Sequence, residues 1–351
     1  RSVTLSAGYV RRGLDGRQHG CYAAAMVLLD RPAAALAWFG RHGTIAVAAS
    51  MFVGIALPPL GALIRPYFAE TVIGLLLLAF LRVDPGALRA QWREPRLLLV
   101  AAVWTMLIQP VLALGMLAGT MHLIGGALPA SLALALVLHA VAPPTFSSPS
   151  LATLIGLNGA ISLAVLIACT AITPLTSPAL VAAFFGSEVS LSPLALGLRL
   201  ILILAGAALT ALAIRAVAGK AWVERQAERL DGLSVLMLFG FAIALMGDVL
   251  PNTLTQPLLV LGLIALSTSV SVALTAATAL AFLLSGREAA FTLGHTSGSR
   301  NMGLMLAAAS AGSAPEFVWL YVALAQFPIY LLPLLYKPLV RRLMPRQDAS
   351  P

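Results

Sequence analysis

Apolar runs of membrane-spanning length recur along nearly all of this chain of 351 residues. A helix needs about 20 apolar residues to cross the hydrocarbon core of a bilayer. Hydrophobic residues make up 60% of the sequence and charged residues 10%, whereas a soluble domain has about 25% charged residues. The pattern predicts an all-α polytopic membrane protein that has the lipid bilayer as a partner. The net charge of +9 then reflects basic loops on one side of the membrane, and no nucleic-acid partner is expected.

Ten spans account for these runs when their ends are placed at proline, glycine and charged residues. The first five cover 44–64, 67–81, 97–118, 129–156 and 158–185, and the second five cover 193–217, 232–250, 257–284, 287–310 and 315–336. Several are short or interrupted, so nine and eleven spans stay as alternatives. Residues 1–43 are expected to be a basic N-terminal segment with a short interfacial helix at Ala33–Gly40, and 337–351 a basic cytoplasmic tail.

All but three of the 22 arginine and lysine residues fall on one side of the membrane in this arrangement. The exceptions are Arg65, Arg199 and Arg300. Because loops rich in arginine and lysine stay in the cytoplasm, both termini are predicted to be cytoplasmic, in the inner (plasma) membrane. Glu70, Arg199 and Asp248 lie near the opposite ends of their helices, where they are either solvated interfacial residues or parts of a gate.

Two spans carry polar or proline-rich interruptions. The fourth contains residues 139–150 (HAVAPPTFSSPS), in which three prolines each remove a backbone donor. The ninth contains residues 293–303 (LGHTSGSRNMG), which place histidine, arginine and asparagine among apolar helices. Irregular backbone at membrane depth is stable only where protein buries it or where it lines water, so both spans are predicted to be broken helices.

The spacing of these interruptions indicates an internal repeat. They lie about 150 residues apart, as do the starts of the first and sixth spans, which predicts two five-helix repeats, 44–185 and 193–336. Because five is odd, the second repeat enters the membrane from the opposite side. Inverted repeats with paired broken helices are typical of secondary transporters, which bind substrate near the middle of the membrane.

The polar residues of the two interruptions are the candidate substrate site. Arg300 is central, because an arginine within a span costs about 2.5–3.5 kcal/mol and must meet a partner, water or a ligand. One interpretation is an anion contact, favoured by helix N-termini that point at the break; the other is a structural tether to carbonyls or to an acidic side chain. The neutral candidates are His295, Thr296, Ser297, Ser299, Asn301, Ser147 and Ser148.

Four residues are candidates for coupling or gating, namely His139, His295, Ser162 and Gln109. A histidine can titrate near neutral pH, so His139 or His295 could carry a coupling proton. A neutral histidine bonded to a carbonyl of a neighbouring helix is the alternative for each. Gln109 precedes Pro110 and is expected either to pack between helices or to line the cavity.

Three stretches, residues 82–85 (RVDP), 143–180 and 298–304 (GSRNMGL), resemble in order and spacing the bile acid:sodium symporter family of the bile/arsenite/riboflavin transporter superfamily. The resemblance covers roughly 36–343. It implies a panel domain formed by the first, second, sixth and seventh spans, and a core domain formed by the other six. Substrate would bind in the cleft between them, and one domain would rock against the other.

The resemblance also indicates where sodium ligands would stand. Family members that couple to sodium use an acidic residue and a glutamine in the ninth-span motif, and the matching residues here are Thr296 and Arg300. Ser148 and Ser162 keep hydroxyl positions of the family, whereas Pro149 takes the place of an amide. Because sodium prefers several oxygens including a carboxylate, the usual sodium sites are expected to be absent or impaired.

The predicted function is therefore secondary transport of a small organic anion by alternating access, driven by protons, by exchange or by the substrate gradient alone. One alternative is a sodium-coupled symporter of bile-acid-like or other organic anions with a rearranged ion site. The other is a membrane sensor that keeps the fold and only binds its ligand. The spans contain no carboxylate pair, metal-ligand spacing or nucleotide loop, which argues against an enzyme, a primary pump, a metal site and a cofactor.

Overall fold

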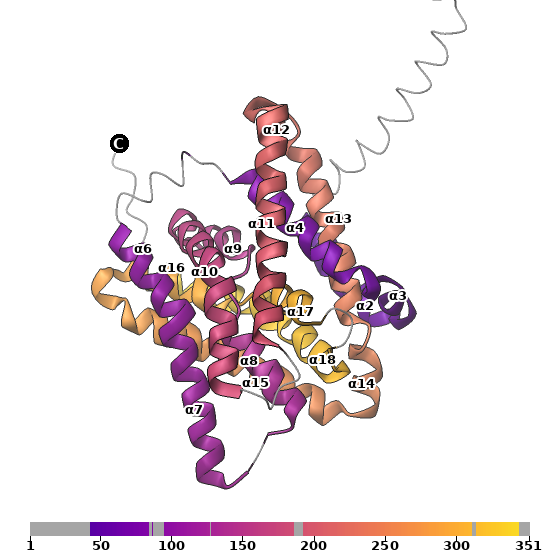
Figure 1. Cartoon of the computed structure of the whole chain (residues 1–351), viewed down its shortest axis with the longest axis vertical. Helices are drawn as coiled ribbons and strands as arrows, with labels where there is room; N and C mark the ends of the chain where they lie inside the picture. The colour runs from indigo at the N-terminus through magenta and orange to yellow at the C-terminus, as the bar shows by residue number, and fades with distance from the viewer. Residues whose placement is uncertain are drawn as a thin grey trace, which may run out of the picture.

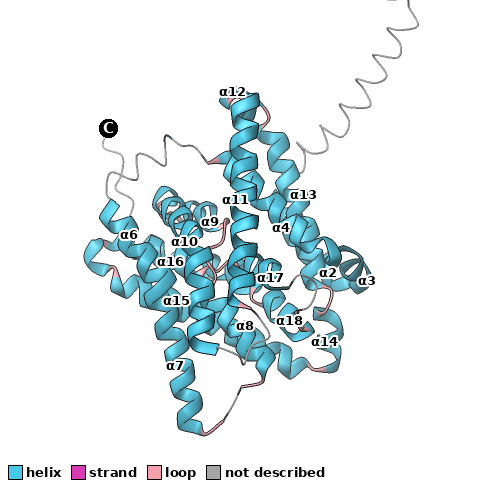
Figure 2. Ribbon diagram, in the orientation of Figure 1, coloured by secondary structure: helices cyan, strands magenta, loops and turns pink. Residues whose placement is uncertain are grey.

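The computed structural model describes residues 43–83, 86, 95–126, 128–185, 192–310 and 314–343. Every regular element within these ranges is helical, and the one isolated bridge joins Pro144 to Arg300 (Figure 2). The predicted interfacial helix at Ala33–Gly40 and the end of the C-terminal tail lie outside the described residues.

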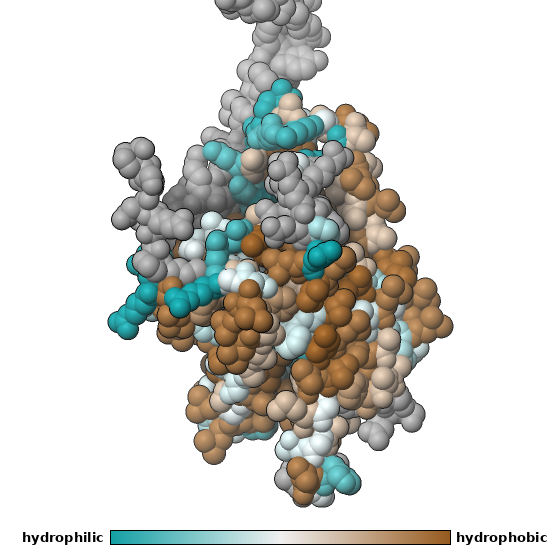
Figure 3. Space-filling view, turned by 90° about the vertical axis from the view of Figure 1, so that its left-hand side faces the viewer, coloured by the Kyte–Doolittle hydropathy of each residue, from teal (hydrophilic) through white to brown (hydrophobic). Residues whose placement is uncertain are grey.

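Seven helical stretches are long and apolar enough to cross a membrane. They are Pro58–Arg82, Pro95–Leu123, Gly159–Phe184, Pro193–Ala218, Ala227–Thr255, Pro257–Ala281 and Glu316–Leu343. Apolar residues cover most of the face seen in Figure 3, and hydrophilic residues gather toward one end of it. The all-helical fold that the composition predicts is confirmed for the described residues, and its long apolar helices fit a membrane-embedded protein.

The two predicted interruptions are real breaks. The predicted fourth span consists of α8 (Ala130–Val141) and α9 (Ser148–Ile155), and the predicted ninth of α16 (Arg287–Gly298) and α17 (Met302–Ser310). With 12 residues each, α8 and α16 extend only about 18 Å, too short to cross the bilayer core alone. Neither half-helix crosses the bilayer core without the one that follows its break.

Other boundaries differ from the prediction. The first expected span is cut at Leu57, where α2 (Gly43–Ala56) ends and α3 (Pro58–Ile64) begins, because Pro58 and Pro59 lack the N–H groups that a continuous helix needs. The seventh starts earlier than expected, as α13 (Ala227–Met246), and is followed by α14 (Val249–Thr255). The last helix, α19 (Gln326–Leu343), continues into the predicted tail. Ten spans and the inverted repeat stay predictions.

Helices α2, α4 (Phe68–Arg82), α11 (Pro193–Ala218) and α13 form one group (Figure 1). Helix α2 packs along α13, and α4 packs against both α11 and α13. The 3-10 turn η1 (Arg65–Tyr67) joins α3 to α4. The approach of α3 to the end of α13 is backbone to backbone, since a Cβ on Gly61 would lie 2.8 Å from Cα of Gly247.

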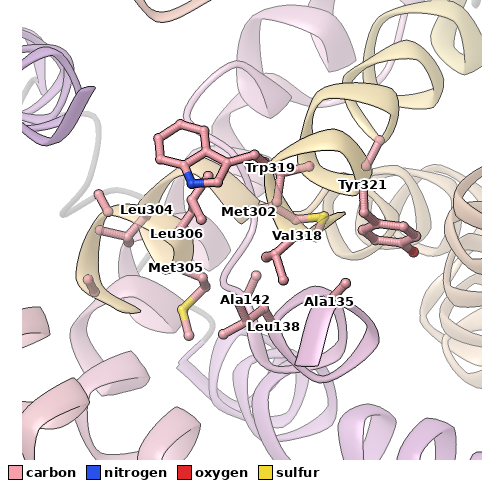
Figure 4. Close-up of a cluster of buried hydrophobic side chains, with 14 of the residues drawn as sticks. Ala135, Leu138, Ala142, Met302, Leu304, Met305, Leu306, Val318, Trp319 and Tyr321 are labelled. Atoms are coloured by element: carbon pink, nitrogen blue, oxygen red, sulfur yellow. The ribbon is translucent and has the colours of Figure 1, made fainter. Parts of the chain in front are cut away.

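The remaining helices enclose the two broken pairs. Helix α10 (Gly159–Phe185) packs on α6 (Pro95–Val103), α9 and α16, and α15 (Pro257–Ala281) packs along α16. A π-helical turn, η2 (Trp104–Ile108), connects α6 to α7 (Gln109–Ile124). Buried side chains of α8, α17 and α18 (Glu316–Leu324) meet in one cluster (Figure 4). The short elements α12 (Lys220–Arg225) and η3 (Leu283–Ser285) complete the described chain.

Candidate transport site at the two helix breaks

The two breaks are joined to each other through their backbones. The N–H of Asn301 donates to the carbonyl oxygen of Pro143 at 2.7 Å, and the N–H of Thr145 donates to that of Ser299 at 2.8 Å. A buried backbone polar group without a partner is costly, and here each break supplies a carbonyl oxygen that accepts from an N–H of the other break. The stretches that the sequence predicts to form one site therefore do lie together.

Arg300 is the largest fully buried side chain of the described protein, at 1% exposure. Its Nη1 donates to the carbonyl oxygens of Ala142 at 2.8 Å and Thr105 at 3.1 Å, and its Nη2 donates to Oε1 of Gln109 at 2.5 Å. Its Nε has no hydrogen-bond partner, and no carboxylate forms an ion pair with it, within the residues that the structure describes. Oxygens of α7, η2 and the end of α8 hold the guanidinium as they would hold a bound cation.

The carbonyl of Thr105 is free for Arg300 because of the π turn and the proline after it. The N–H of Gln109 bonds to the carbonyl oxygen of Trp104, one residue further back than in an α-helix. In this register the carbonyl of Thr105 would accept from residue 110, and Pro110 has no N–H. Sequence reasoning missed Thr105, because Pro110 in an ordinary α-helix would free the carbonyl of Met106, and only the π turn moves the free carbonyl to Thr105.

The C-terminal end of α8 faces Arg300. Beyond the contact with Ala142, the carbonyl oxygen of Val141 accepts from Oγ of Ser177 at 2.7 Å. A helix C-terminus carries partial negative charge, which stabilises a guanidinium. The sequence predicts helix N-termini around the guanidinium; the start of α17 follows Arg300 closely, but the guanidinium itself bonds to the C-terminal end of α8. The geometry is that of a tether to carbonyls.

Gln109 is fixed on its other side by α15. Its Nε2 donates to the carbonyl oxygen of Leu274 at 2.7 Å and to Oγ1 of Thr278 at 3.0 Å, which turns Oε1 toward Arg300. The same hydroxyl of Thr278 accepts from Nε1 of Trp104 at 2.9 Å and lies 2.6 Å from Oγ of Ser297. Gln109 and Ser297 thus belong to one buried network that positions the arginine.

Hydroxyl groups bond to one another where the resemblance would place sodium ligands. Oγ1 of Thr296 donates to Oγ of Ser162 at 2.7 Å, and Ser162 lies 3.4 Å from Oγ of Ser148. All three side chains are fully buried. The described residues contain no group of three or more histidine, cysteine or acidic side chains that could hold a metal ion. The cluster offers neutral oxygens without a carboxylate.

The two histidines have different surroundings. Nδ1 of His139 lies 3.0 Å from Oη of Tyr321, between α8 and α18, and both side chains are buried. His295 is also buried, and its Nε2 has no hydrogen-bond partner among the described residues. His139 is thus bonded to a tyrosine hydroxyl, and a carbonyl of a neighbouring helix, the expected partner, is not the group found there.

Of the predicted substrate contacts, only Ser147 and Asn301 are partly exposed. Oγ of Ser147 lies 3.4 Å from Oγ1 of Thr145, and Oδ1 of Asn301 accepts from the N–H of Leu304 at 3.0 Å. The remaining candidates are buried against neighbouring helices; they are His295, Thr296, Ser297, Ser299, Arg300 and Ser148. Ser147 and Asn301 are therefore the predicted contacts that a molecule beside the crossing reaches first.

The His139–Tyr321 contact predicts a measurable loss of stability. Replacing Tyr321 with phenylalanine leaves Nδ1 of His139 without its buried partner, which costs about 1–3 kcal/mol. Thermal unfolding of the purified variant should show a lower midpoint than the wild type. Tyr67→Phe is the control, because Tyr67 is 63% exposed and its variant should unfold like the wild type. Equal midpoints for all three proteins would contradict the assigned contact.

Neither the protein-family models nor the curated proteins contain a match to this chain. The fold and the composition define its class, which is that of a multi-pass helical membrane protein. Membership of the symporter family thus stays a prediction from the resemblance.

Proposed function

We propose that this protein is a secondary carrier of a small organic anion that works by alternating access without bound sodium. The observation that carries the proposal is the Arg300 guanidinium, which is held by protein oxygens at the crossing of two broken helices. We further propose ten spans in two inverted repeats, with both termini in the cytoplasm and the protein in the inner membrane of the cell.

The packing of the helices supports alternating access. One group, formed by α2, α4, α11 and α13, lies beside the helices that carry the two breaks. Transporters with paired broken helices move one such group against the other around a site at the breaks. We propose that these two groups are the panel and the core that the resemblance implies.

The fixed charge of Arg300 supports independence from sodium. The guanidinium takes up three oxygens that a free cation would need, and its charge repels a second cation nearby. The hydroxyl cluster of Ser148, Ser162 and Thr296 lacks the carboxylate that a hard cation prefers. The carrier would therefore use protons, exchange or the substrate gradient.

The same charge supports an anion as substrate. Within the described residues no carboxylate neutralises Arg300, so the crossing keeps a positive potential in a low-dielectric interior. Ser147 and Asn301 would bind the substrate's polar end. Phe146, which lies 5.8 Å from the ring of Phe80 across the two groups, would contact an apolar body.

A thermostability screen of the purified protein tests the proposal. Organic carboxylates, with and without an apolar ring, are added in sodium and in choline buffer. An anion at 100 times its dissociation constant should raise the free energy of unfolding by about 2.7 kcal/mol in both salts. The shift should be lost in Arg300→Gln and kept in Arg300→Lys, each compared with its own ligand-free midpoint. A shift that requires sodium and survives in Arg300→Gln would contradict the proposal.

A further inference from the structure

Two arginines tie the two helix groups together at one end of the molecule. Helices α11 and α13 both meet α12 at one end (Figure 1). Arg199 lies near the other end of α11, and Arg65 precedes α4 at the end far from Arg82. Helices α4 and α13 carry an ion pair at each end, since Arg82 pairs with Asp231 near α12 and Arg65 with Asp248 at the far end.

Arg65 and Phe68 form a seat for Trp319 of α18. Cζ of Arg65 lies 4.5 Å from the centre of the Trp319 ring, and the ring of Phe68 meets that of Trp319 edge to face at 4.9 Å. Asp248 holds the guanidinium over the indole. Trp319 is 7% exposed and lies at the edge of the buried cluster of α8, α17 and α18 (Figure 4). The seat therefore connects the α4–α13 pair to the helices of the breaks.

Arg199 holds the end of α17. Its Nη1 donates to the carbonyl oxygens of Ala308 and Ala309, both at 3.3 Å. The last carbonyls of a helix have no partner within the helix, and a cation there is favoured by the helix dipole. Because α17 starts at Met302, directly after Arg300 and Asn301, a displacement of its far end is transmitted to the crossing.

We propose that Trp319 in its seat and Arg199 on α17 form a gate that closes the transport cleft at the end away from α12. The inference rests on the proposed alternating access, because a carrier must open at each end in turn. A charged or aromatic contact of this kind separates and re-forms more readily than an interdigitated apolar core. The Arg65 and Asp248 side chains are 26% and 28% exposed, so water can solvate both when they separate.

Thiol labelling tests the gate without any substrate. The background carries Cys21→Ser and Cys169→Ala, and Ser147→Cys at the crossing is the reporter. A membrane-impermeant thiol reagent is applied to each face of oriented vesicles, and Lys220→Cys in α12 shows which face is which. Arg65→Gln, Arg199→Gln and Trp319→Ala should each raise labelling from the face opposite α12 at least about fivefold, the usual lower size of a conformational coupling.

Arg82→Gln is the matched control, since it breaks the ion pair at the other end of the same two helices. It should leave labelling from the face opposite α12 at the wild-type rate. Unchanged labelling in both arginine variants, or an equal rise in Arg82→Gln, would overturn the gate. If Trp319→Ala fails to fold, the two partly exposed arginines still decide the result. If an anion stabilises the protein but labelling is unchanged in the gate variants, the gate is refuted and the proposed function is not. If labelling rises in the gate variants but no anion stabilises the protein, the anionic substrate is refuted and the gate is not.

Discussion

Replacing Arg300 with leucine is expected to destabilise the folded protein by about 3 kcal/mol or more. The change leaves the carbonyl oxygens of Thr105 and Ala142 and Oε1 of Gln109 buried without a donor. Each unsatisfied buried acceptor costs about 1–3 kcal/mol. Removal of the cost of burying a charge offsets part of this loss. Unfolding in detergent, followed by helical circular dichroism, measures the difference.

Arg199→Leu is the control for this prediction. Arg199 also donates to two backbone carbonyls, those at the end of α17, but its bonds are longer, at 3.3 Å, and its side chain is only partly buried. Arg199→Leu should therefore lower the free energy of unfolding clearly less than Arg300→Leu does. A second variant, Arg300→Ala, leaves room for a free cation, and millimolar methylguanidinium should stabilise it more than the wild type. Equal losses for the two leucine variants would contradict the assigned role of the oxygens around Arg300.

Gly298→Ala is expected to cost about 1–3 kcal/mol, because it overpacks the contact between α15 and α16. A Cβ at this position would lie 2.0 Å from Oγ1 of Thr275 and 2.8 Å from the carbonyl oxygen of Ser271. Thr275 can rotate away, but the backbone at Ser271 cannot, so the two helices must separate. Because α16 ends at Gly298, this separation also displaces Arg300. The thermal midpoint and the fraction of monodisperse protein should both fall.

Gly262→Ala in α15 provides the comparison, since a Cβ there would meet nothing within 4 Å. Alanine is the better helix former, so this variant should be neutral or stabilised by up to about 1 kcal/mol. The double variant Gly298→Ala with Thr275→Ala should regain only part of the loss, because the clash with Ser271 stays. Full recovery in the double variant would contradict the close approach of Gly298 to the backbone of Ser271.

The breaks in the fourth and ninth spans could be predicted because their causes are local. Pro143, Pro144 and Pro149 remove backbone donors wherever they occur in a helix, and glycines with small hydroxyl residues weaken α16 at its end. The same rule applied to Pro58 and Pro59 would have found the end of α2. The apolar run across 44–64 conceals it, because the run is long enough to cross the bilayer core as one helix.

The partners of Arg300 could not be predicted, because they come from distant parts of the chain. Thr105 and Gln109 lie far from Arg300 in the sequence. The availability of the Thr105 carbonyl also depends on a π-helical turn. The contact of His139 with Tyr321 likewise requires knowing that α8 packs on α18. Hydropathy and spacing locate the polar residues, whereas tertiary packing decides which of them are buried.

Counterflow in proteoliposomes tests the central claim most directly. Vesicles loaded with an anion that stabilises the protein are diluted into buffer with a trace of the same labelled anion, in sodium and in choline. The account predicts equal accumulation of label in both salts, and none with Arg300→Gln. Accumulation only in sodium would contradict it and favour the sodium symporter. Stoichiometric binding without accumulation in either salt would contradict it in favour of a sensor.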